Sequence, residues 1–534
     1  LMNEQRIPPD QIKAITSKAA EQLFRRDYVG ARKLYETLLR DNQTDVVAMT
    51  GLGKALEGMG NFSYAVKAFR SAIAISPNAF DAIHHLGRLL LNSNRTDKAI
   101  AFLKSAVDSG QGSHAAWTDL GIAQKLVGDF DAARDSLDHA IKLKPESIEA
   151  RFNLAACLRE IGLVDDARSL LENIIKTDPE FGAAPNLLAS IHSDLNEPDQ
   201  AMSVLNNYLA AHPNDIESRQ NASLIQLRSG RVAEGFDTYE WRLSPNQRSV
   251  PVRPFTQKFW RGEQLDGEHL LIWLEQGLGD EILSLSMLKD VLEKAPHCSI
   301  ECDHRLLEIV ARSFPTVTAI GRQDPPASET GRADYTFPVW SAARLFRRSW
   351  EQFPQHSGYL KADDAGVSAI RKRYEEKAKG RRLVGLSWSS DSRGGRLKTP
   401  PIEYWRAILE DPENFFVGLQ YAPQQHDIDI LSQLGEAGFY MDPTIDTQND
   451  LESAAAQIGA LDAVVSISNS TAHLAGALGK PIATVIPEGY GSFWYWHRDH
   501  DQSPWYPSMR ICRQNSPGDW PSAISKARSW LKAG

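Results

Sequence analysis

The sequence is poor in cysteine, has no excess of basic residues and contains no long apolar run. Four cysteines among 534 residues cannot form a disulfide framework, and Cys298 and Cys302 lack the second ligand pair of a zinc site. Reduced cysteines, together with a start that lacks the apolar stretch of a signal peptide, predict a cytoplasmic protein. No apolar run approaches the ~20 residues of a membrane helix, which argues against membrane insertion.

Charge and length limit the classes of protein further. A formal net charge of -9 argues against a nucleic-acid-binding protein. The fractions of hydrophobic residues (42%) and charged residues (24%) are those of a globular protein. A chain of 534 residues exceeds what one hydrophobic core holds, so we expect at least two domains.

The first part of the chain repeats itself every 34 residues. Small residues recur with this period at Ala31, Ala65, Ala99, Ala133, Ala167, Ala201 and Gly235. A leucine followed by glycine or alanine recurs at Leu52, Leu86, Leu120, Leu154 and Leu188, and a proline at Pro77, Pro145, Pro179 and Pro213. Small residues let two helices cross closely, and proline ends a helix. The pattern resembles the tetratricopeptide repeat, a helical hairpin that stacks into an α-solenoid.

A solenoid of this kind has a concave face that usually binds a peptide or a protein. We expect the position before each leucine–glycine pair to face this groove. That position holds His85, Asp119, Asn153 and Asn221, with Leu187 interrupting the polar series. The repeats therefore predict a protein partner, and homo-oligomerisation through the solenoid is the alternative use of the same surface.

The pattern changes after the repeats. Residues 244–268 carry prolines and aromatics without helical periodicity and predict a connector. Beyond it, short apolar runs alternate with helical segments, which predicts parallel sheets covered by helices. We expect strands at 270–274, 299–302, 335–338 (a sheet edge), 383–388, 415–419 and 463–467, and helices at 280–294, 305–312, 365–379, 401–409, 426–435, 450–459 and 523–532.

The predicted domains follow these patterns. They are a repeat solenoid (1–243), a linker (244–268), a first α/β half (269–362) and a second α/β half (363–534). Ligands of open parallel sheets bind outside the carboxyl ends of the strands, in the cleft between such halves. The loops at those ends are therefore the candidate site.

The segment from Leu461 to Pro487 organises the second half. Its apolar run at 463–467 suits a buried parallel strand, and small polar residues follow at 468–471. We expect the next helix to begin at His473. Hydroxyls, free amide N–H groups and a helix start together suit a phosphate group. The alternative is an ordinary strand–helix unit with a capping loop.

The loop at 275–281 reads EQGLGDE and is not a dinucleotide-binding fingerprint, because Ile282 stands at the third glycine position. Asp280 suits two roles. It is a typical helix N-cap, or it is a carboxylate that deprotonates an acceptor hydroxyl. Glu281 is an adjacent candidate for the second role.

Three further loops carry candidate residues. In the loop at 387–398, Arg396 and Lys398, with Arg393, suit neutralisation of a diphosphate or phosphate monoester; the alternative is a solvated basic loop. Tyr421 suits stacking on a base. The aromatic segment at 488–507 suits packing on a sugar face, or a rigid plug of the core.

Five motifs in order carry a family resemblance: EQGLGDEI, GLSW, GLQ, STAHLAGALGKP and SPWYPSMRICRQNSPGDW. Together they resemble bacterial glycosyltransferases in which tetratricopeptide repeats precede a heptosyltransferase-like domain. The resemblance covers essentially the whole chain. It implies a GT-B fold of two Rossmann-like halves, with the nucleotide sugar bound mainly by the second half and neither metal nor cofactor required.

The resemblance also implies roles by position. Asp280 matches the presumed catalytic base. The donor-binding positions are Ser387, Trp388, Ser389, Lys398, Gln420, Ser470, Thr471, Ala472 and His473, to which the residue patterns add Arg396 and Tyr421. The sequence departs from the pattern at Ser468–Asn469, where many relatives have Asp-Thr. This departure removes a carboxylate beside the donor and leaves the donor type open.

We therefore expect transfer of a sugar from a nucleotide sugar to a serine or threonine hydroxyl of a protein that the repeats capture. Flagellin glycosyltransferases share this arrangement, which makes flagellin the expected acceptor and a CMP-nonulosonic acid the expected donor. Two alternatives remain open. One is a non-catalytic repeat scaffold with a degenerate GT-B domain, and the other is a transferase acting on lipopolysaccharide or another glycan.

Overall fold

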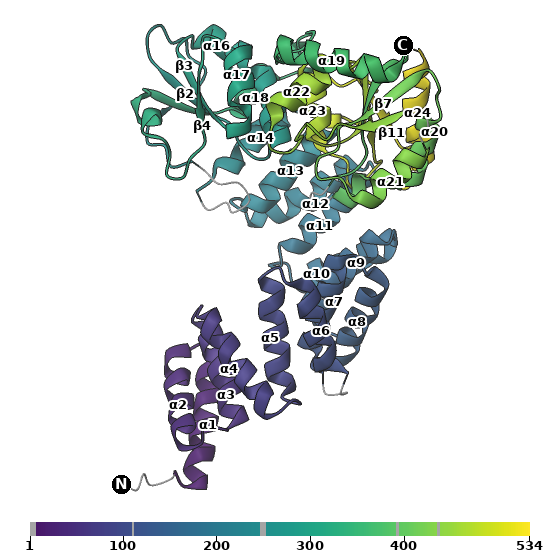
Figure 1. The fold of residues 1–534 in the computed structure, drawn as a ribbon. Coiled ribbons are helices and arrows are strands. Elements are labelled where there is room, and N and C mark those ends of the chain that lie inside the picture. Colours follow the sequence, from purple (N-terminus) through teal and green to yellow (C-terminus); the bar gives the residue numbers. More distant parts are fainter. Residues whose placement is uncertain (1–6, 109–111, 246–252, 391–394, 435–437, 534) are drawn as a thin grey trace. The chain divides into compact units, whose positions relative to one another are not determined.

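The computed structural model describes residues 7–108, 112–245, 253–390, 395–434 and 438–533. The chain forms two compact units that divide between Ile191 and His192 (Figure 1). This division falls inside helix α11 (Ala183–Asp194), within the repeat pattern. The first unit is built from repeat helices, whereas the second combines repeat helices with two parallel sheets.

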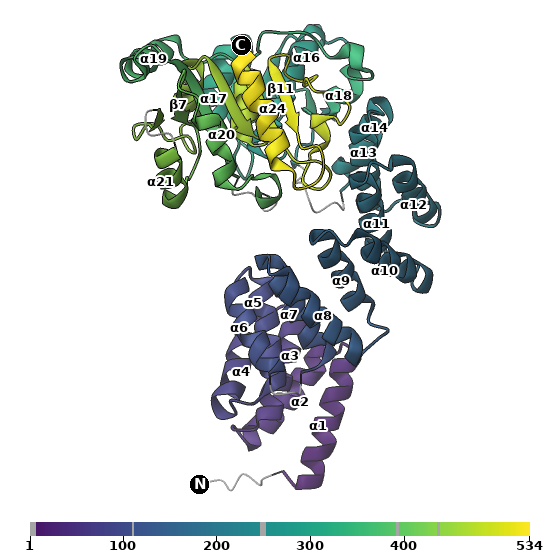
Figure 2. The same cartoon turned by 90° about the vertical axis from the view of Figure 1, so that its right-hand side faces the viewer.

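Helices of the first unit pack as hairpins, each against the next along the chain (Figure 1, Figure 2). They are α1 (Pro9–Phe24), α2 (Tyr28–Asp41), α3 (Val46–Gly58), α4 (Phe62–Ile75), α5 (Phe80–Asn92), α6 (Thr96–Val107), α7 (His114–Val127), α8 (Phe130–Leu143), α9 (Ile148–Glu160) and α10 (Val164–Thr177). A Cβ on Gly53 would lie 2.4 Å from Phe69, and one on Gly121 would lie 2.6 Å from Leu137. The glycines therefore lie where the helices of a hairpin touch, which explains the period.

The repeat pattern continues in the second unit. Helices α12 (Pro198–Ala211), α13 (Ile216–Arg228) and α14 (Val232–Tyr239) precede the 3-10 turn η1 (Glu240–Leu243). Helix α13 packs against η8 (Trp494–Trp496), and α14 packs against α18 (Ser341–Phe346). These repeat helices therefore share one hydrophobic core with the sheets of their unit.

The first sheet has five parallel strands in the order β1-β5-β2-β3-β4. They are β1 (Lys258–Phe259), β2 (Leu270–Trp273), β3 (Cys298–Cys302), β4 (Thr318–Gly321) and β5 (Tyr335–Pro338). The prediction that β5 is an edge strand is wrong, because β1 pairs on its far side. Strand β1 has only two residues and lies in the predicted linker, so no sequence period marks it.

The second sheet has six parallel strands in the order β11-β10-β9-β6-β7-β8. They are β6 (Arg382–Ser387), β7 (Asn414–Gly418), β8 (Phe439–Met441), β9 (Ala463–Ile467), β10 (Ile482–Ile486) and β11 (Met509–Arg513). Counted along the chain from β6, this order is that of a doubly wound sheet, whose winding reverses between β6 and β9. The α/β architecture predicted for this part of the chain is confirmed.

Helices cover both faces of the second sheet. Helices α20 and α24 lie on one face, where α24 runs along β10 and β11 (Figure 2), and α19, α22 and α23 lie on the other. The helices and 3-10 turns of this α/β part are α15 (Leu278–Ser284), η2 (Leu285–Met287), α16 (Leu288–Lys294), η3 (His304–Leu306), α17 (Leu307–Ser313), η4 (Ser328–Arg332), α18, η5 (Trp350–Gln352), α19 (Asp364–Ala378), η6 (Gly395–Lys398), η7 (Ile402–Trp405), α20 (Arg406–Leu409), α21 (Gln425–Leu434), α22 (Leu451–Gly459), α23 (Ser470–Ala477), η8 and α24 (Trp520–Ala533).

The compact units and the predicted domains divide the chain differently. The repeat pattern places a limit at 243, whereas the structure divides after Ile191. The last repeat helices bury their apolar faces against the α/β part and so belong to its unit. The predicted limits at 243, 268 and 362 describe sequence patterns and stay predictions.

Candidate functional site

The loops after β6 and β9 lie side by side, because these two strands pair where the winding of the second sheet reverses. Asn469 joins the loops. Its Nδ2 donates to Ser387 Oγ at 2.8 Å, and its Oδ1 accepts from the backbone N–H of Ala472 at 3.2 Å. Asn469 is thus the N-cap of α23, which begins at Ser470. The predicted start at His473 is three residues too late.

Gln420, at the end of β7, fixes the shape of the loop after β6. Its Oε1 accepts from the backbone N–H groups of Trp388 and Ser389, both at 3.0 Å, and from Ser387 Oγ at 3.2 Å. Its Nε2 donates to the backbone oxygens of Ser389 and Tyr421. The Gln420 amide therefore holds the loop in shape, and it contributes to ligand binding only through the position of that loop.

Two more predicted donor-binding side chains face the interior. The Trp388 indole is buried in the core under α20 and α24, and its Nε1 donates to Asp427 at 3.1 Å. Ala472 is fully buried. Their positions shape the loops at 387–389 and 470–473, whereas the half-buried Ser389 and Ser470 remain accessible there.

A small pocket opens at the carboxyl ends of the strands of the second sheet. It is lined by Leu419, Thr447, Leu451, Ala454, Gln457, Ile458, Ser470, Thr471 and Leu474. The sequence identified Ser470 and Thr471 among these. It missed Gln457, although a single glutamine in the otherwise small and apolar segment AAAQIG was a signal for a functional position.

The amide of Gln457 has a fixed orientation. Tyr374 Oη donates to the acceptor-only Asp442 carboxylate at 2.8 Å, so it accepts from Gln457 Nε2 at 2.9 Å. Gln457 Oε1 is then left without a hydrogen-bond partner, although the residue is 1% exposed. A buried acceptor without a partner is costly, so the pocket offers a place for a ligand N–H group.

Asp280 and Lys398 approach each other from the two halves of the α/β part. Burial raises the pKa of Asp280 to about 6, although the Gly277 N–H and the charge of Lys398 oppose this shift. Burial likewise lowers the pKa of Lys398 to about 8, against the opposing effect of Asp280. At neutral pH the carboxylate is therefore mostly ionised and the ammonium mostly protonated, in a partly dehydrated setting.

Asp280 lies on α15, which packs directly on α23. A Cβ on Gly279 would lie 2.9 Å from the His473 ring, so only glycine lets the two helices approach this closely. Helix α15 begins at Leu278, which makes Gly277 its N-cap and Asp280 its third residue. The N-cap role predicted for Asp280 is thus wrong; its Oδ2 instead accepts from the Gly277 N–H at 3.3 Å.

His473 lies inside this junction as a neutral ring. Its Nδ1 is 2.9 Å from Tyr506 Oη, and the ring stacks on Trp496 with centroids 5.2 Å apart. Burial and the nearby charge of Lys398 lower the pKa of His473 to about 3. Any contact of His473 with a phosphate would therefore be that of a neutral hydrogen-bonding group.

Glu281, next to Asp280, is fully engaged inside the first half. It is 1% exposed, and its Oε2 accepts from the Asp303 N–H at 2.9 Å. Its Oε1 forms an ion pair with Arg322. Burial raises the pKa of Glu281, against the opposing effect of Arg322. Of the two carboxylates, Asp280 is the one at the junction of the halves.

The remaining predicted residues are only partly placed. Tyr421 Oη lies 3.5 Å from Ser390 Oγ, and its ring is half-buried. Arg393 and the side chain of Arg396 lie outside the described residues. Lys398 is therefore the described cation of this loop, and its Nζ lies 4.8 Å from the centroid of the Phe493 ring.

The aromatic segment at 488–507 plugs the core of the second unit. Trp494, Trp496, Trp505 and Tyr506 are buried, and Trp494 packs edge-on against Phe236 of α14 at 5.8 Å. Of the two readings of this segment, the structure supports a core plug. No pattern in the sequence predicted that its partner would be a repeat helix.

A buried ion pair lies beside this aromatic cluster. Arg242 Nε and Nη2 donate to the two carboxylate oxygens of Glu275, at 3.0 and 2.9 Å, and both residues are 2% exposed. Glu275 belongs to the loop after β2, which leads into α15 and Asp280. The end of the repeat pattern thereby helps to position the candidate base.

The polar positions predicted for the solenoid groove form bonds with neighbouring repeats. His85 pairs with Glu57, Asp119 pairs with His84, and the buried Asn153 accepts from Lys125 at 3.0 Å. These side chains therefore link successive hairpins in addition to lining the first helix of each repeat.

Comparison with known families identifies the repeats. Tetratricopeptide-repeat profiles match residues 17–80, 56–120, 127–181 and 162–223. The chain is 27% identical to the protein FlbA of Caulobacter vibrioides over 97% of this chain and 89% of that protein. It is 23% identical to a CTR9 homologue of Arabidopsis thaliana over 23% of this chain and 11% of that protein. The chain is thus a repeat protein similar to FlbA over nearly its whole length.

Solved structures share similarity with parts of this chain. YrrB, described as a tetratricopeptide-repeat protein with an unusual peptide-binding site, is 18% identical with a TM-score of 0.31, covering 34% of this chain and 95% of that one. A repeat protein from Parabacteroides merdae is 14% identical with a TM-score of 0.38, covering 45% and 95%. Among the described residues, no helix is long and apolar enough to cross a membrane.

Proposed function

We propose that this protein transfers a sugar from a nucleotide sugar to a serine or threonine hydroxyl of a protein captured by its repeats. One observation carries the proposal. A carboxylate with a raised pKa, Asp280 of the first half, lies close to Lys398 of the second half, and its helix α15 packs on α23, whose first residues line a pocket. This is where an open α/β sheet binds its ligand.

Asp280 is suited to be the general base. A pKa of about 6 leaves it ionised at neutral pH, yet basic enough to accept a proton in the transition state. It takes the proton of the acceptor hydroxyl as that oxygen bonds to the anomeric carbon of the sugar. The bond between this carbon and the phosphate oxygen breaks, and the nucleotide leaves with the electron pair.

Lys398 and the start of α23 are suited to hold the donor phosphate. The Lys398 ammonium opposes the negative charge that grows on the leaving group, and its burial strengthens this effect. The Ser470 and Thr471 hydroxyls line the pocket at the positive end of α23. The family resemblance places the donor at the same loops.

The pocket under α22 is suited to the nucleobase. Its leucine, isoleucine and alanine side chains offer flat apolar contact, and Gln457 Oε1 offers an acceptor to an N–H group of the base. The resemblance to flagellin glycosyltransferases favours flagellin as the acceptor and a CMP-nonulosonic acid as the donor, in the cytoplasm. Cytosine carries an exocyclic amino group that matches Gln457.

The second candidate function is a non-catalytic scaffold. It is favoured by Ser468 and Asn469, which stand where many relatives have Asp-Thr. Their side chains make internal bonds, Ser468 with Trp496 Nε1 at 2.8 Å and Asn469 with Ser387. A transferase acting on lipopolysaccharide or another glycan is less favoured, because a glycan acceptor would not explain the presence of protein-binding repeats.

Calorimetric titration with CMP, UMP, GMP and AMP, followed by a transfer assay, tests the proposal. We expect one nucleotide to bind best, with affinity falling roughly tenfold to a hundredfold in Lys398→Met and about tenfold in Gln457→Met. Gln425→Met makes the same change on the exposed face of α21 and should bind normally. Asp280→Asn should bind the nucleotide and the acceptor but not transfer the sugar.

Three outcomes decide between the candidates. Binding without transfer in the wild type, across donors and acceptors, favours the scaffold. Full transfer by Asp280→Asn removes the proposed base. Failure of every nucleotide to bind contradicts the donor site as a whole.

A further inference from the structure

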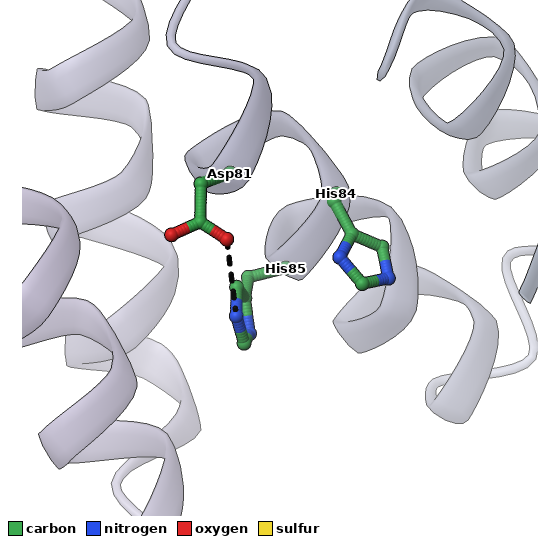
Figure 3. Close-up of side chains that lie close together, drawn as sticks. All are labelled: Asp81, His84 and His85. Atoms are coloured by element: carbon green, nitrogen blue, oxygen red, sulfur yellow. Dashed lines mark ion pairs between the residues drawn. The ribbon is translucent and has the colours of Figure 1, made fainter. Parts of the chain in front are cut away.

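We propose that the first unit binds a divalent transition-metal ion, represented by Zn²⁺, through Asp81, His84 and His85 of helix α5 (Figure 3). One ligand atom of each residue lies within 4.8 Å of those of the other two. A carboxylate oxygen and two imidazole nitrogens are ligands that zinc, nickel and copper accept. This site lies in the repeats and is independent of the proposed transferase site.

Each of the three side chains has its second polar atom held by a neighbouring helix. Nε2 of His84 is 2.7 Å from Asp119 Oδ2 on α7. Nδ1 of His85 is 2.9 Å from Glu57 Oε2 on α3. Oδ2 of Asp81 accepts from Lys54. The atoms left for a metal are therefore Asp81 Oδ1, His84 Nδ1 and His85 Nε2.

This arrangement is the one that orients histidine ligands in metal sites. A ligating histidine usually donates its other ring N–H to a carboxylate, which fixes the tautomer and makes the ligating nitrogen more basic. Asp119 and Glu57 supply such a carboxylate for His84 and His85, from helices on either side of α5.

Arg88 competes with Glu57 for a hydrogen bond with Nδ1 of His85. Its Nη2 lies 3.0 Å from His85 Nδ1, but it also donates to Glu57 Oε1 at 2.8 Å. Glu57 thus takes one hydrogen bond from Arg88 and one from the His85 N–H, which leaves Nε2 of His85 unprotonated.

The three ligand atoms lie at most 4.8 Å apart and must move closer together to hold one ion. Tetrahedral zinc with bonds of about 2.1 Å places its ligand atoms about 3.4 Å apart. His85 Nε2 and Asp81 Oδ1 are already 3.7 Å apart, and Figure 3 shows the Asp81 carboxylate facing the His85 ring. The Asp81 side chain is 59% exposed, so its Oδ1 can turn toward the ion while Oδ2 keeps its contact with Lys54.

The local charge also suits a cation. Asp81, Glu57 and Asp119 contribute three negative charges, and Lys54 and Arg88 contribute two positive charges, so one negative charge remains. Three protein ligands leave a fourth position open, which a water or a side chain of a captured protein can occupy. His85 stands at the position that the repeat pattern predicts to face the groove, where such a partner would arrive.

Titration of the full chain with Zn²⁺ tests the site. We expect one tight site in the wild type and its loss, by at least a hundredfold in affinity, in His85→Phe, which keeps a flat ring against Phe69. His139→Phe makes the same change at an exposed position of α8 and should bind Zn²⁺ like the wild type. Glu57→Gln, which removes only the supporting charge, should weaken binding roughly tenfold to a hundredfold.

A second measurement does not depend on a variant. Co²⁺ added to the wild type should give the intense visible absorption of a tetrahedral site, and Zn²⁺ should displace it. The proposal is overturned if His85→Phe binds Zn²⁺ as tightly as His139→Phe. It is equally overturned if the wild type shows no such Co²⁺ absorption, which would leave these side chains as an ion-pair network.

Discussion

The repeat helices of the two units share one sequence period but differ in what they pack against. In the first unit each hairpin buries its small residues against the next hairpin, as Gly121 does against Leu137. In the second unit α14 turns aromatic residues toward the α/β part, where Phe236 meets Trp494 and Tyr239 meets Trp340. The same motif thus serves as a repeating module in one unit and as part of a globular core in the other.

The 34-residue period therefore predicts where the helices lie, but it does not predict where one compact unit ends and the next begins. A solenoid is held together by nearest-neighbour contacts, so each of its hairpins depends on the next. Arg242 and Glu275, by contrast, form a buried pair that joins the end of the repeat pattern to the loop after β2.

The largest effect is expected at the buried ion pair. Arg242→Met leaves Glu275 charged inside the core, so the second unit should lose about 3–5 kcal/mol of unfolding free energy. Urea unfolding followed by tryptophan fluorescence measures this, since Trp340 and Trp494 lie in the same core. Arg348→Met breaks an exposed pair with Asp237 and should cost less than about 1 kcal/mol. Equal costs would show that the repeat end is not part of this core.

A smaller effect is expected in the first unit. A methyl group at Gly121 would press on Leu137, so Gly121→Ala should cost about 1–3 kcal/mol through overpacking. Thermal unfolding followed by the helical circular dichroism signal reports it. Gly267→Ala is the matched control, because no atom lies within 4 Å of its added Cβ. A neutral Gly121→Ala would contradict the close crossing of α7 and α8.

The smallest effect is a pH dependence confined to the second unit. The pKa of Lys398 is lowered to about 8, so its positive charge is present below pH 8 and is lost as the pH rises above it. Nucleotide affinity, measured calorimetrically, should therefore fall above pH 8 by up to about tenfold per pH unit. Lys398→Arg keeps its charge at these pH values and should flatten the profile. A fall that persists in this variant would assign the titration to another group.

Much of the fold followed from local patterns. The 34-residue period predicted the helical hairpins, because close helix crossings require small residues at fixed places. The continuous apolar runs predicted β2, β6, β7 and β9, because strands of a covered parallel sheet are buried on both faces. The short strands β1, β4 and β8 and the edge strand β11 were missed. Runs of two to five residues with mixed polarity carry too little periodicity to recognise.

The candidate site was predicted in outline and not in detail. The loops after β2, β6 and β9 were identified because polar residues follow apolar strands there. Which side chains remain available was not predictable. Gln420 and Trp388 are used internally, His473 is a buried neutral ring, and Gln457 keeps a free acceptor. Each of these outcomes depends on partners distant in the sequence.

The repeats, the alternation of strands and helices, and the candidate residues Asp280, Lys398 and 468–471 could all be recognised in the sequence. The folded chain was needed to show that α12–α14 belong with the sheets, that Asp280 lies close to Lys398, and that Asp81, His84 and His85 present ligand atoms to one another. Periodicity and capping act within a few residues, which is why they can be recognised locally. Burial, pKa shifts and the orientation of an amide or imidazole are instead set by groups that only the folded chain brings together.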